Sequence, residues 1–378
     1  MKIALVHSFY GSGRPSGENS IVLEQVEALR EAGHTVRLLS LNTDQESRKK
    51  FYKLESAWKT ISGHGKFPLD EIESFKPDVV HVHNLFPNIG TDWIDEVQIP
   101  IVTTLHNFRP LCANGLLFRD GAKCLDCPDG RPFSAVVHKC YHDSRLASIP
   151  LTIRNAKGIH QNKLLNNAAA IICLSRMAAD LFTQYGVDST KVVVVQNGIA
   201  APKTRRAPMH NGKWAAVGRL TPEKGFTELS LAWPEGLGLD IIGDGPENTR
   251  PSTLLPGVRQ LPSMPRDQLL SELSSYTGLV FPSLCQEMQP TIILEAMALG
   301  IPVVARAGSA GAELVQTHKC GSIYSSDEFL ARALQDAAAN RSHYGDAGLE
   351  AFEHSFQQGS WVERLENVYK AVLDGGFK

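Results

Sequence analysis

Two glutamates, Glu287 and Glu295, have a spacing that would let them bind one polar ligand. Pro290 lies between them and suits the first position of a helix, because its φ is fixed and its missing N–H would have had no partner. Gly300 suits a left-handed helix stop, and residues 301–305 are apolar, as in a short buried strand. Glu287 is therefore predicted in a loop and Glu295 on the second turn of a helix, with the free N–H groups of the helix start between them. The pair could bind an elongated polyol; alternatively, it is a loop glutamate and a solvated helical glutamate.

A pair of cations occurs earlier, in a loop that enters another helical pattern. Arg219 and Lys224 are five residues apart. Arg binds a diphosphate with a planar fork and Lys binds it as a point charge, so the two together could hold a departing diphosphate. The alternative is two ordinary surface cations.

Two histidines end apolar runs that are predicted to be strands. His83 ends the run 76–84 and His106 ends the run 99–106. In open parallel sheets, ligands bind at the carboxyl ends of the strands. Both histidines are therefore candidates for a ligand site, although a buried histidine with satisfied hydrogen bonds is the simpler interpretation of each.

Apolar strand patterns alternate with helical patterns along most of the chain, which predicts an α/β fold with doubly wound parallel sheets. The predicted strands cover residues 2–7, 36–41, 76–84, 99–106, 170–175, 191–196, 214–217, 239–242, 278–282 and 301–305. Residues 199–212 lack any periodicity and are predicted to be a linker between two domains. Ser360 and Glu363 form a capping box that opens a final helix with one apolar stripe, which must pack against another part of the protein.

Two of these stretches resemble one enzyme family. The Glu-x7-Glu pair is followed by Ala-Met-Ala-x-Gly-x-Pro-Val-Val, and residues 218–225 read Gly-Arg-Leu-x-x-x-Lys-Gly. Both motifs resemble those of retaining glycosyltransferases of family 4. The resemblance implies the GT-B fold: two Rossmann-like domains that face a cleft, with the last helix crossing back to the first domain.

The resemblance also implies roles for individual residues. It assigns His106, Glu287, Arg219 and Lys224 to catalysis: His106 and Glu287 face the transferred sugar, and the two cations stabilise the departing diphosphate. It assigns donor binding to Gly17, Arg219, Lys224, Asp244, Glu287, Met288, Gln289, Thr291 and Glu295, with Glu295 on the ribose hydroxyls. His83 is then interpreted as structural. One departure is Met288-Gln289, where the family often has Gly and Phe, and this position bears on the identity of the donor sugar.

The expected function is retaining transfer of a sugar from a UDP- or GDP-sugar to an acceptor hydroxyl, in polysaccharide or glycolipid synthesis, with chemistry that needs no metal or other cofactor. The acceptor would be a sugar or a lipid-linked sugar. Two alternatives share the same fold: a sugar-nucleotide epimerase, and a non-catalytic protein that binds nucleotide sugars. The expected domains are 1–198 with a cysteine-rich insertion at about 107–145, the linker 199–212, a donor-binding domain 213–358, and the final helix 359–378.

Composition narrows the class of protein. The 378 residues are 43% hydrophobic and 21% charged, with a formal net charge of −2, so no overall basic field favours nucleic acid. No apolar run reaches the roughly 20 residues of a membrane span, and the start of the chain is predicted to be a strand rather than a signal peptide. We therefore expect a cytoplasmic protein. Residues 109–163 carry nine Arg or Lys against four Asp. They form either a mixed solvated surface or a face for an anionic acceptor or for the inner surface of a membrane.

Four of the seven cysteines, Cys112, Cys124, Cys127 and Cys140, fall in the insertion. Cys124 and Cys127 form a C-x2-C pair in a polar stretch that has little core of its own. Four thiolates could bind a structural zinc ion, so a zinc site is one prediction for this insertion. His138 and His142 are possible substitute ligands; disulfides are the less favoured alternative in a cytosolic chain.

Overall fold

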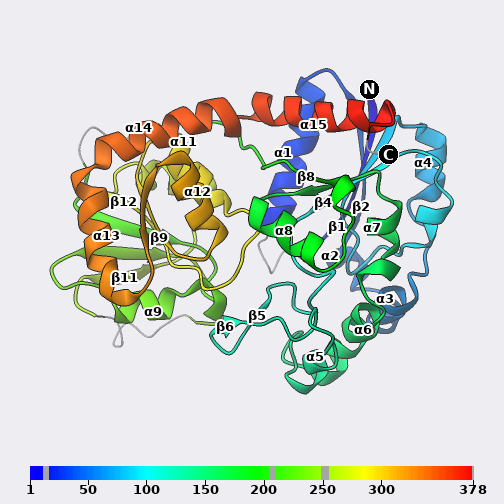
Figure 1. The fold of residues 1–378 in the computed structure, drawn as a ribbon, viewed down its shortest axis with the longest axis horizontal. Helices are drawn as coiled ribbons and strands as arrows, with labels where there is room; N and C mark the ends of the chain where they lie inside the picture. The colour runs from blue at the N-terminus through cyan, green and yellow to red at the C-terminus, as the bar shows by residue number, and fades with distance from the viewer. Residues whose placement is uncertain (12–16, 205–209, 248–254, 377–378) are drawn as a thin grey trace. The chain divides into compact units, whose positions relative to one another are not determined.

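The computed structural model describes residues 1–11, 17–204, 210–247 and 255–376 (Figure 1). The chain forms two compact units. The first contains Met1–Leu117, Cys124–Asn197 and Gly359–Lys378, and the second contains Phe118–Lys123 and Gly198–Gln358. Each unit is built on a six-stranded parallel sheet. The predicted α/β fold with two Rossmann-like sheets is confirmed.

The sheet of the first unit has the strand order β2-β1-β3-β4-β7-β8. The order reverses between β1 and β3, and the crevice at such a reversal is where α/β sheets bind ligands. The strands are β1 Lys2–Phe9, β2 Thr35–Asn42, β3 Val79–Asn84, β4 Ile101–Leu105, β7 Ala170–Cys173 and β8 Val192–Val194.

Helices cover both faces of this sheet, which explains why its central strands are almost continuously apolar. One face packs against α4 and a 3-10 turn, through Phe75 and Trp93 among others. The helices of this unit are α1 Gly17–Glu31, α2 Thr43–Glu46, α3 Tyr52–Ser62, α4 Leu69–Phe75, α5 Ser134–Val137, α6 Arg145–Ala156, α7 Lys163–Asn167 and α8 Arg176–Gln184, with 3-10 turns η1 Asp92–Asp95, η2 Ile159–Gln161 and η3 Ser189–Lys191.

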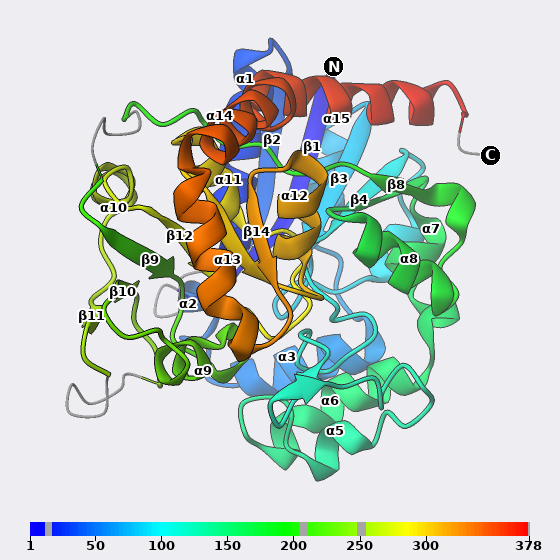
Figure 2. The same ribbon diagram turned by 60° about the vertical axis from the view of Figure 1, so that its left-hand side comes forward.

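The last helix, α15 (Gln358–Leu373), belongs to the first unit for almost its whole length. It crosses α1 in both ribbon views (Figures 1 and 2), and Gln25 of α1 donates to its Tyr369 hydroxyl at 3.4 Å. Its Glu366 Oε1 lies 2.9 Å from His34 Nε2, and its Tyr369 hydroxyl lies 2.7 Å from His81 Nδ1. The predicted return of the final helix to the first domain is confirmed, although the helix begins two residues before the predicted capping box.

The sheet of the second unit has the strand order β11-β10-β9-β12-β13-β14, with its reversal between β9 and β12. The strands are β9 Lys213–Val217, β10 Gly238–Ile242, β11 Val258–Leu261, β12 Gly278–Phe281, β13 Val303–Arg306 and β14 Gly321–Tyr324. The helices are α9 Phe226–Leu231, α10 Arg266–Leu273, α11 Thr291–Ala298, α12 Ala310–His318, α13 Asp327–Ala339 and α14 Arg341–Ala351, with the 3-10 turn η4 Pro222–Lys224 and a π-helical turn at Phe352–Phe356.

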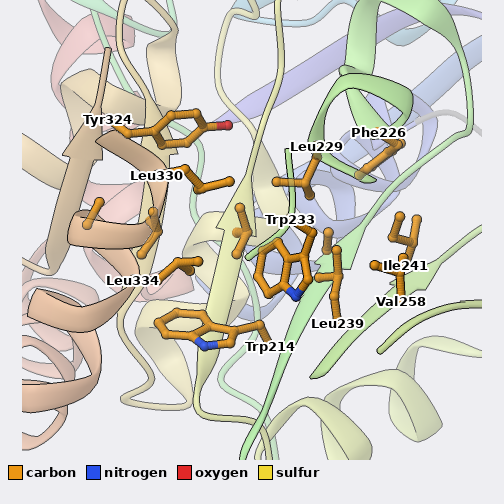
Figure 3. Packing of buried hydrophobic residues seen from close by; sticks show 14 of the residues in the cluster. Trp214, Phe226, Leu229, Trp233, Leu239, Ile241, Val258, Tyr324, Leu330 and Leu334 are labelled. Carbon is orange, nitrogen blue, oxygen red and sulfur yellow. The ribbon is translucent and has the colours of Figure 1, made fainter. Parts of the chain in front are cut away.

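Figure 3 shows the core on one face of this second sheet. Trp214 from β9 and Trp233 after α9 pack with Leu330 and Leu334 of α13, and all four side chains are buried. Figure 2 shows α13 in front of β14, the strand against which it packs. This core fixes the backbone from which the loops after β9 and β12 emerge.

The boundaries of the elements differ from the predicted ones by one to three residues. Such differences are expected, because the ends of helices and strands fray and their assignment varies by one or two residues. The strand predicted at 301–305 is β13 at Val303–Arg306, and the helix predicted to begin at Pro290 begins at Thr291. Gly300 has the predicted left-handed φ, at 64°. The insertion after β4 contains the hairpin of β5 (Phe118–Arg119) and β6 (Ala122–Lys123). Among the described helices, none combines the length and apolar character that a membrane span requires.

Candidate functional site

Lys224 and Glu287, both predicted to act on one ligand, form an ion pair in the second unit. The two residues are 63 positions apart in the sequence. Lys224 Nζ lies 2.8 Å from Glu287 Oε1, and Ser283 donates a hydrogen bond of 2.6 Å to the same oxygen. Burial lowers the pKa of Lys224, but the charge and hydrogen bond of Glu287 together with the nearby Cys285 and Glu223 outweigh it, so the pKa is raised overall and the ammonium stays charged. The loop after β9 and the loop after β12 therefore place a fixed cation beside a fixed carboxylate at the reversal of the strand order.

Arg219 lies in the same loop as Lys224, and its side chain contacts that of Glu223. Arg219 Nη2 lies 3.4 Å from Glu223 Oε1, which also accepts a 2.7 Å hydrogen bond from the Thr221 hydroxyl. The Arg219 side chain is 46% exposed, whereas that of Glu223 is only 9% exposed. The guanidinium is thus tethered at one nitrogen and keeps other N–H donors for a ligand.

The start of α11 holds most of the other predicted donor-binding residues. Thr291 is its first residue, Met288 before it is buried, and no side chain caps the helix start. Gln289 is half-buried beside Met288. Glu295, one turn further on in α11, is 8% exposed, and its Oε1 lies 2.8 Å from Arg266 Nε. Its carboxylate is therefore ion-paired and mostly buried, not solvated.

Asp244 follows β10 in a tight turn that presses against the loop carrying Arg219. A Cβ on Gly243 would collide with the carbonyl oxygen of Gly218, so this approach requires glycine. Leu220 N donates to Asp244 O at 3.0 Å. The Asp244 carboxylate accepts hydrogen bonds from the hydroxyl and the backbone N–H of Ser263, which lower its pKa. It is therefore bound to the loop after β11.

His106, the predicted catalytic histidine, lies at the end of β4 in the first unit. Its Nε2 is 2.8 Å from Nδ1 of His83, so the two predicted candidates contact each other directly. Burial lowers the pKa of His106 to about 3 and that of His83 well below its usual value. Both rings are neutral at physiological pH, and one donates its proton to the other.

His83 is in turn stacked on His81, with ring centroids 4.3 Å apart. Gln25 Nε2 lies 3.1 Å from His81 Nδ1, and because an amide nitrogen only donates, Nδ1 is the acceptor. His81 Nε2 then donates to the Thr104 hydroxyl at 2.8 Å. The sequence analysis interprets His83 as structural. The structure adds that His83 also fixes the ring of His106 through their hydrogen bond.

Gly17 is the first residue of α1 and is exposed. Residues 12–16, directly before it, lie outside the described residues. The carboxylate of the adjacent Glu18 is buried. Burial raises its pKa to about 7, against the opposing effects of Arg109 and of a hydrogen bond from Asn107.

The prediction of a four-cysteine zinc site is not supported and is corrected here. In the described ranges, no three side chains of His, Cys, Asp or Glu are grouped to hold a metal ion. None of the seven cysteines forms a disulfide bond with another described residue. The Cys112 thiol donates to Asn114 Oδ1 at 3.0 Å and also contacts Cys127, whose Sγ lies 3.8 Å from the Pro132 carbonyl oxygen. Cys127 and Cys140 pack on a small apolar cluster that gives this insertion a core of its own.

Three residues contact the predicted site residues but were not predicted from the sequence. They are Ser283 on Glu287, Arg266 on Glu295 and Ser263 on Asp244. Ser283 and Ser263 follow β12 and β11, so their position after a parallel strand is the signal that could have identified them.

Two family models match the chain, and together they span most of it. Residues 15–201 match the model described as Glycosyltransferase Family 4, and residues 212–340 match the model described as Glycosyl transferases group 1.

Individual proteins agree with these matches. The teichuronic acid biosynthesis glycosyltransferase TuaC of Bacillus subtilis is 23% identical over 98% of this chain and 99% of its own. A GDP-mannose-dependent alpha-mannosyltransferase of Mycolicibacterium smegmatis is 33% identical over 42% of each chain. The structure of Anabaena HepE in complex with UDP-glucose has the same fold, with a TM-score of 0.63, 15% identity, and coverage of 98% of this chain and all of that one. With the two parallel sheets and both family motifs in place, the chain belongs to the family 4 glycosyltransferases and has their GT-B fold.

Proposed function

We propose that the protein is a retaining glycosyltransferase that transfers a sugar from a UDP- or GDP-sugar to an acceptor hydroxyl in the synthesis of a polysaccharide or glycolipid. The donor class is supported by HepE, solved with UDP-glucose, and by the GDP-mannose-dependent relative. The acceptor class is supported by the relative named for teichuronic acid biosynthesis. The proposed place of action is the cytoplasm, at the inner face of the membrane.

Arg219 and Lys224 would stabilise the departing nucleoside diphosphate. As the bond between the sugar C1 and the phosphate oxygen breaks, negative charge grows on the β-phosphate. Two cations held in a loop by Glu223 and Glu287 can receive that charge without reorganising. This role requires no metal ion, so we propose metal-independent chemistry.

Glu287 and His106 would position the transferred sugar. Glu287 has one oxygen fixed by Lys224 and Ser283, and its other oxygen could accept a hydrogen bond from a sugar hydroxyl. The acceptor oxygen then bonds to C1 on the face that the diphosphate leaves, and its proton passes to a departing phosphate oxygen. Retention by this front-face route needs no covalent nucleophile, and the motifs supply none.

The nucleotide would lie along α11, with Glu295 on the ribose hydroxyls and the uncapped helix start near the phosphates. Arg266 orients the Glu295 carboxylate for this contact. Gly17, Asp244, Met288, Gln289 and Thr291 would complete the donor site.

The observation that carries this proposal is the ion pair of Lys224 with Glu287, the residues of two separate motifs. The test is a screen of UDP-, GDP-, ADP- and dTDP-sugars by thermal shift, followed by NMR of the product formed from the best donor. We expect one donor class to raise Tm, and the product to keep the anomeric configuration of the donor in the presence of EDTA. An inverted product would refute retention. Donor consumption without a glycosylated product would favour the epimerase, and nucleotide binding without turnover would favour the binding protein.

A further inference from the structure

A cavity within the first unit has an unusual balance of charge. It has a volume of about 190 Å³ and lies among α3, the loops after β3 and β4, and the end of α6 with the residues that follow. His106 is among its lining residues. Five Lys or Arg side chains line it and no Asp or Glu does; the cations are Lys59, Arg109, Arg154, Lys157 and Lys163.

Two of the five cations are neutralised by acids just outside the cavity. Lys59 lies 2.7 Å from Glu55, and Lys163 lies 3.0 Å from Asp92. In the part of the chain that the structure describes, Arg109, Arg154 and Lys157 form no ion pair with a carboxylate. Three cations without a paired acid thus lie around one cavity.

Arg109 is held in a fixed orientation. Its guanidinium carbon lies 4.5 Å from the centre of the Phe86 ring and 5.7 Å from that of Tyr141. Nη1 donates to the carbonyl oxygen of Ala113 at 3.1 Å, whereas Nε is buried and has no partner among the described residues. A buried donor without a partner is costly, so a ligand atom that accepts from it would stabilise the site.

Arg154 supports this arrangement from α6. Its Nη2 donates to the carbonyl oxygen of Arg109 at 2.7 Å, and its Nε donates to Asn155 Oδ1 at 3.1 Å. Burial and the neighbouring charge of Arg109 lower the pKa of Arg154 to about 9. The two guanidiniums therefore repel each other in a desolvated place, and an anion between them would relieve that repulsion.

Glu18 is a carboxylate near Arg109, but it is only a partial counterion of Arg109. Burial raises the pKa of Glu18 to about 7, although the charge of Arg109 lowers it, so the negative charge of Glu18 is only partial at neutral pH. Its Oε2 also accepts a hydrogen bond from Asn107. Most of the positive charge at the cavity is therefore left for a ligand.

We propose that this cavity, which we call the anion pocket, binds a phosphate or diphosphate group carried by the acceptor. The inference rests on the proposed function, because it assigns the pocket to the second substrate of the same reaction. Guanidinium groups bind phosphate with paired N–H donors, and Lys157 adds a point charge at an exposed edge. Since His106 lines the same cavity, an anchored phosphate would bring the acceptor to the residue proposed to position the transferred sugar.

The test measures binding of two phosphate-bearing probes by isothermal titration calorimetry, with the full chain saturated with the nucleoside diphosphate of the donor that the thermal-shift screen identifies, so that the donor site is occupied. Geranyl diphosphate represents a lipid-linked acceptor and glucose 1-phosphate a soluble one. Geraniol and glucose are the uncharged controls. We expect at least one phosphate-bearing probe to bind at one site and neither control to bind. If only geranyl diphosphate binds, the source of the phosphate is a lipid; if only glucose 1-phosphate binds, it is a sugar phosphate.

Substitutions locate the binding site. Arg109→Gln should weaken binding of the phosphate probe by about tenfold or more, the size expected for a lost charge-assisted hydrogen bond. Lys157→Gln, at an exposed position, should weaken it by a few-fold without affecting the fold. Arg145→Gln is the matched control, because this exposed cation lies on α6 but does not line the pocket, and its Kd should equal that of the wild type.

The outcomes separate this inference from the proposed function. If neither phosphate probe binds, or if Lys157→Gln and Arg109→Gln bind it as the wild type does, the anion pocket is refuted while binding of the donor's nucleoside diphosphate still supports the glycosyltransferase. If none of the screened nucleotide sugars binds, the donor site has failed instead. Should Arg109→Gln not fold, Arg109→Lys, which keeps the charge and loses the fork, takes its place together with Lys157→Gln.

Discussion

Lys224 shows how one side chain can serve both the folded state and the reaction. Its ammonium is desolvated, which opposes its charge, and Glu287 compensates for that cost across 2.8 Å. A cation prepared in this way does not need to lose a hydration shell when a diphosphate departs. The residue is therefore the best single position at which to test the proposed chemistry.

We predict that Lys224→Ala lowers kcat by about 10²–10³-fold, the size typical of losing one preorganised group that stabilises developing charge. The measurement is steady-state kinetics with the donor identified by thermal shift. Arg332→Ala is the matched control, because it removes an exposed cation from α13 in the same unit, and it should keep the wild-type kcat. An unchanged kcat in Lys224→Ala would exclude the residue from catalysis.

Spacing in the sequence was enough to choose Arg219, Lys224, Glu287 and Glu295 as a group, because both motifs resemble those of a known family. It could not show that Lys224 and Glu287 contact each other, since they follow different strands and meet only when β9 and β12 pair. For the same reason it could not assign Arg266 to Glu295, which comes from a separate helix.

At the scale of elements, alternation along β3 places two histidines on the same side of the strand. His81 and His83 are two residues apart, so their rings stack within the first unit. The neighbouring strands add His7 on β1 and His106 at the end of β4. Burial lowers the pKa of His7 to about 4 and those of His81 and His106 to about 3, with His83 also well below its usual value.

These histidines make a specific prediction for the pH dependence of stability. Between about pH 4 and pH 6.5 the unfolded chain protonates them and the folded chain does not, so the unfolded state binds more protons. The free energy of unfolding should therefore fall as the pH falls through this window, by up to about 1.4 kcal/mol per pH unit for each histidine. Urea denaturation at pH 5, 6, 7 and 8 measures this slope.

A substitution isolates the contribution of one ring. Below about pH 6.5, His81→Gln should reduce the slope by up to about 1.4 kcal/mol per pH unit, because one buried titrating group is gone. His343→Gln is the control, since His343 is exposed on α14 and its removal should leave the slope unchanged. Equal slopes in the wild type and His81→Gln would contradict the assignment of a neutral, buried His81.

At the scale of the whole molecule, the two ends of the chain build one unit and the middle builds the other. The second sheet is contained in residues 213–324, whereas the first unit needs both Met1–Asn197 and α15. On α15 the side chains of Trp361, Leu365 and Tyr369 are no more than 1% exposed. Burying each large apolar side chain contributes about 1.5–3 kcal/mol, so α15 is a substantial part of the stability of the first unit.

We predict that the two parts behave differently as fragments. Residues 198–358 should fold alone, with a cooperative urea transition followed by circular dichroism. Residues 1–197 should unfold at a lower urea concentration than the full chain, because they lose the hydrogen bonds of Tyr369 with Gln25 and His81 and the apolar burial that α15 provides. A synthetic peptide of residues 358–378 should restore the stability of the 1–197 fragment; the same peptide with Trp361→Ser and Leu365→Ser is the control. Equal stability of 1–197 with and without the peptide would contradict this role of α15.

The sequence by itself determined the fold class, the final helix packing on the first domain, and the family. The reason is that these depend on local periodicity and on short motifs, each contained in one loop and the helix it enters. It also identified the candidates His83 and His106, because the ends of apolar runs mark the carboxyl edge of a parallel sheet.

Only the tertiary structure decided which of these residues touch. It joined Lys224 to Glu287 and His106 to His83, it did not group the four cysteines for a metal, and it placed Arg109 and Arg154 at one cavity. Each outcome depends on which strands pair and how far each loop reaches, and the free energies that fix these arise from packing between segments far apart in the chain. Local sequence carries no record of those contacts.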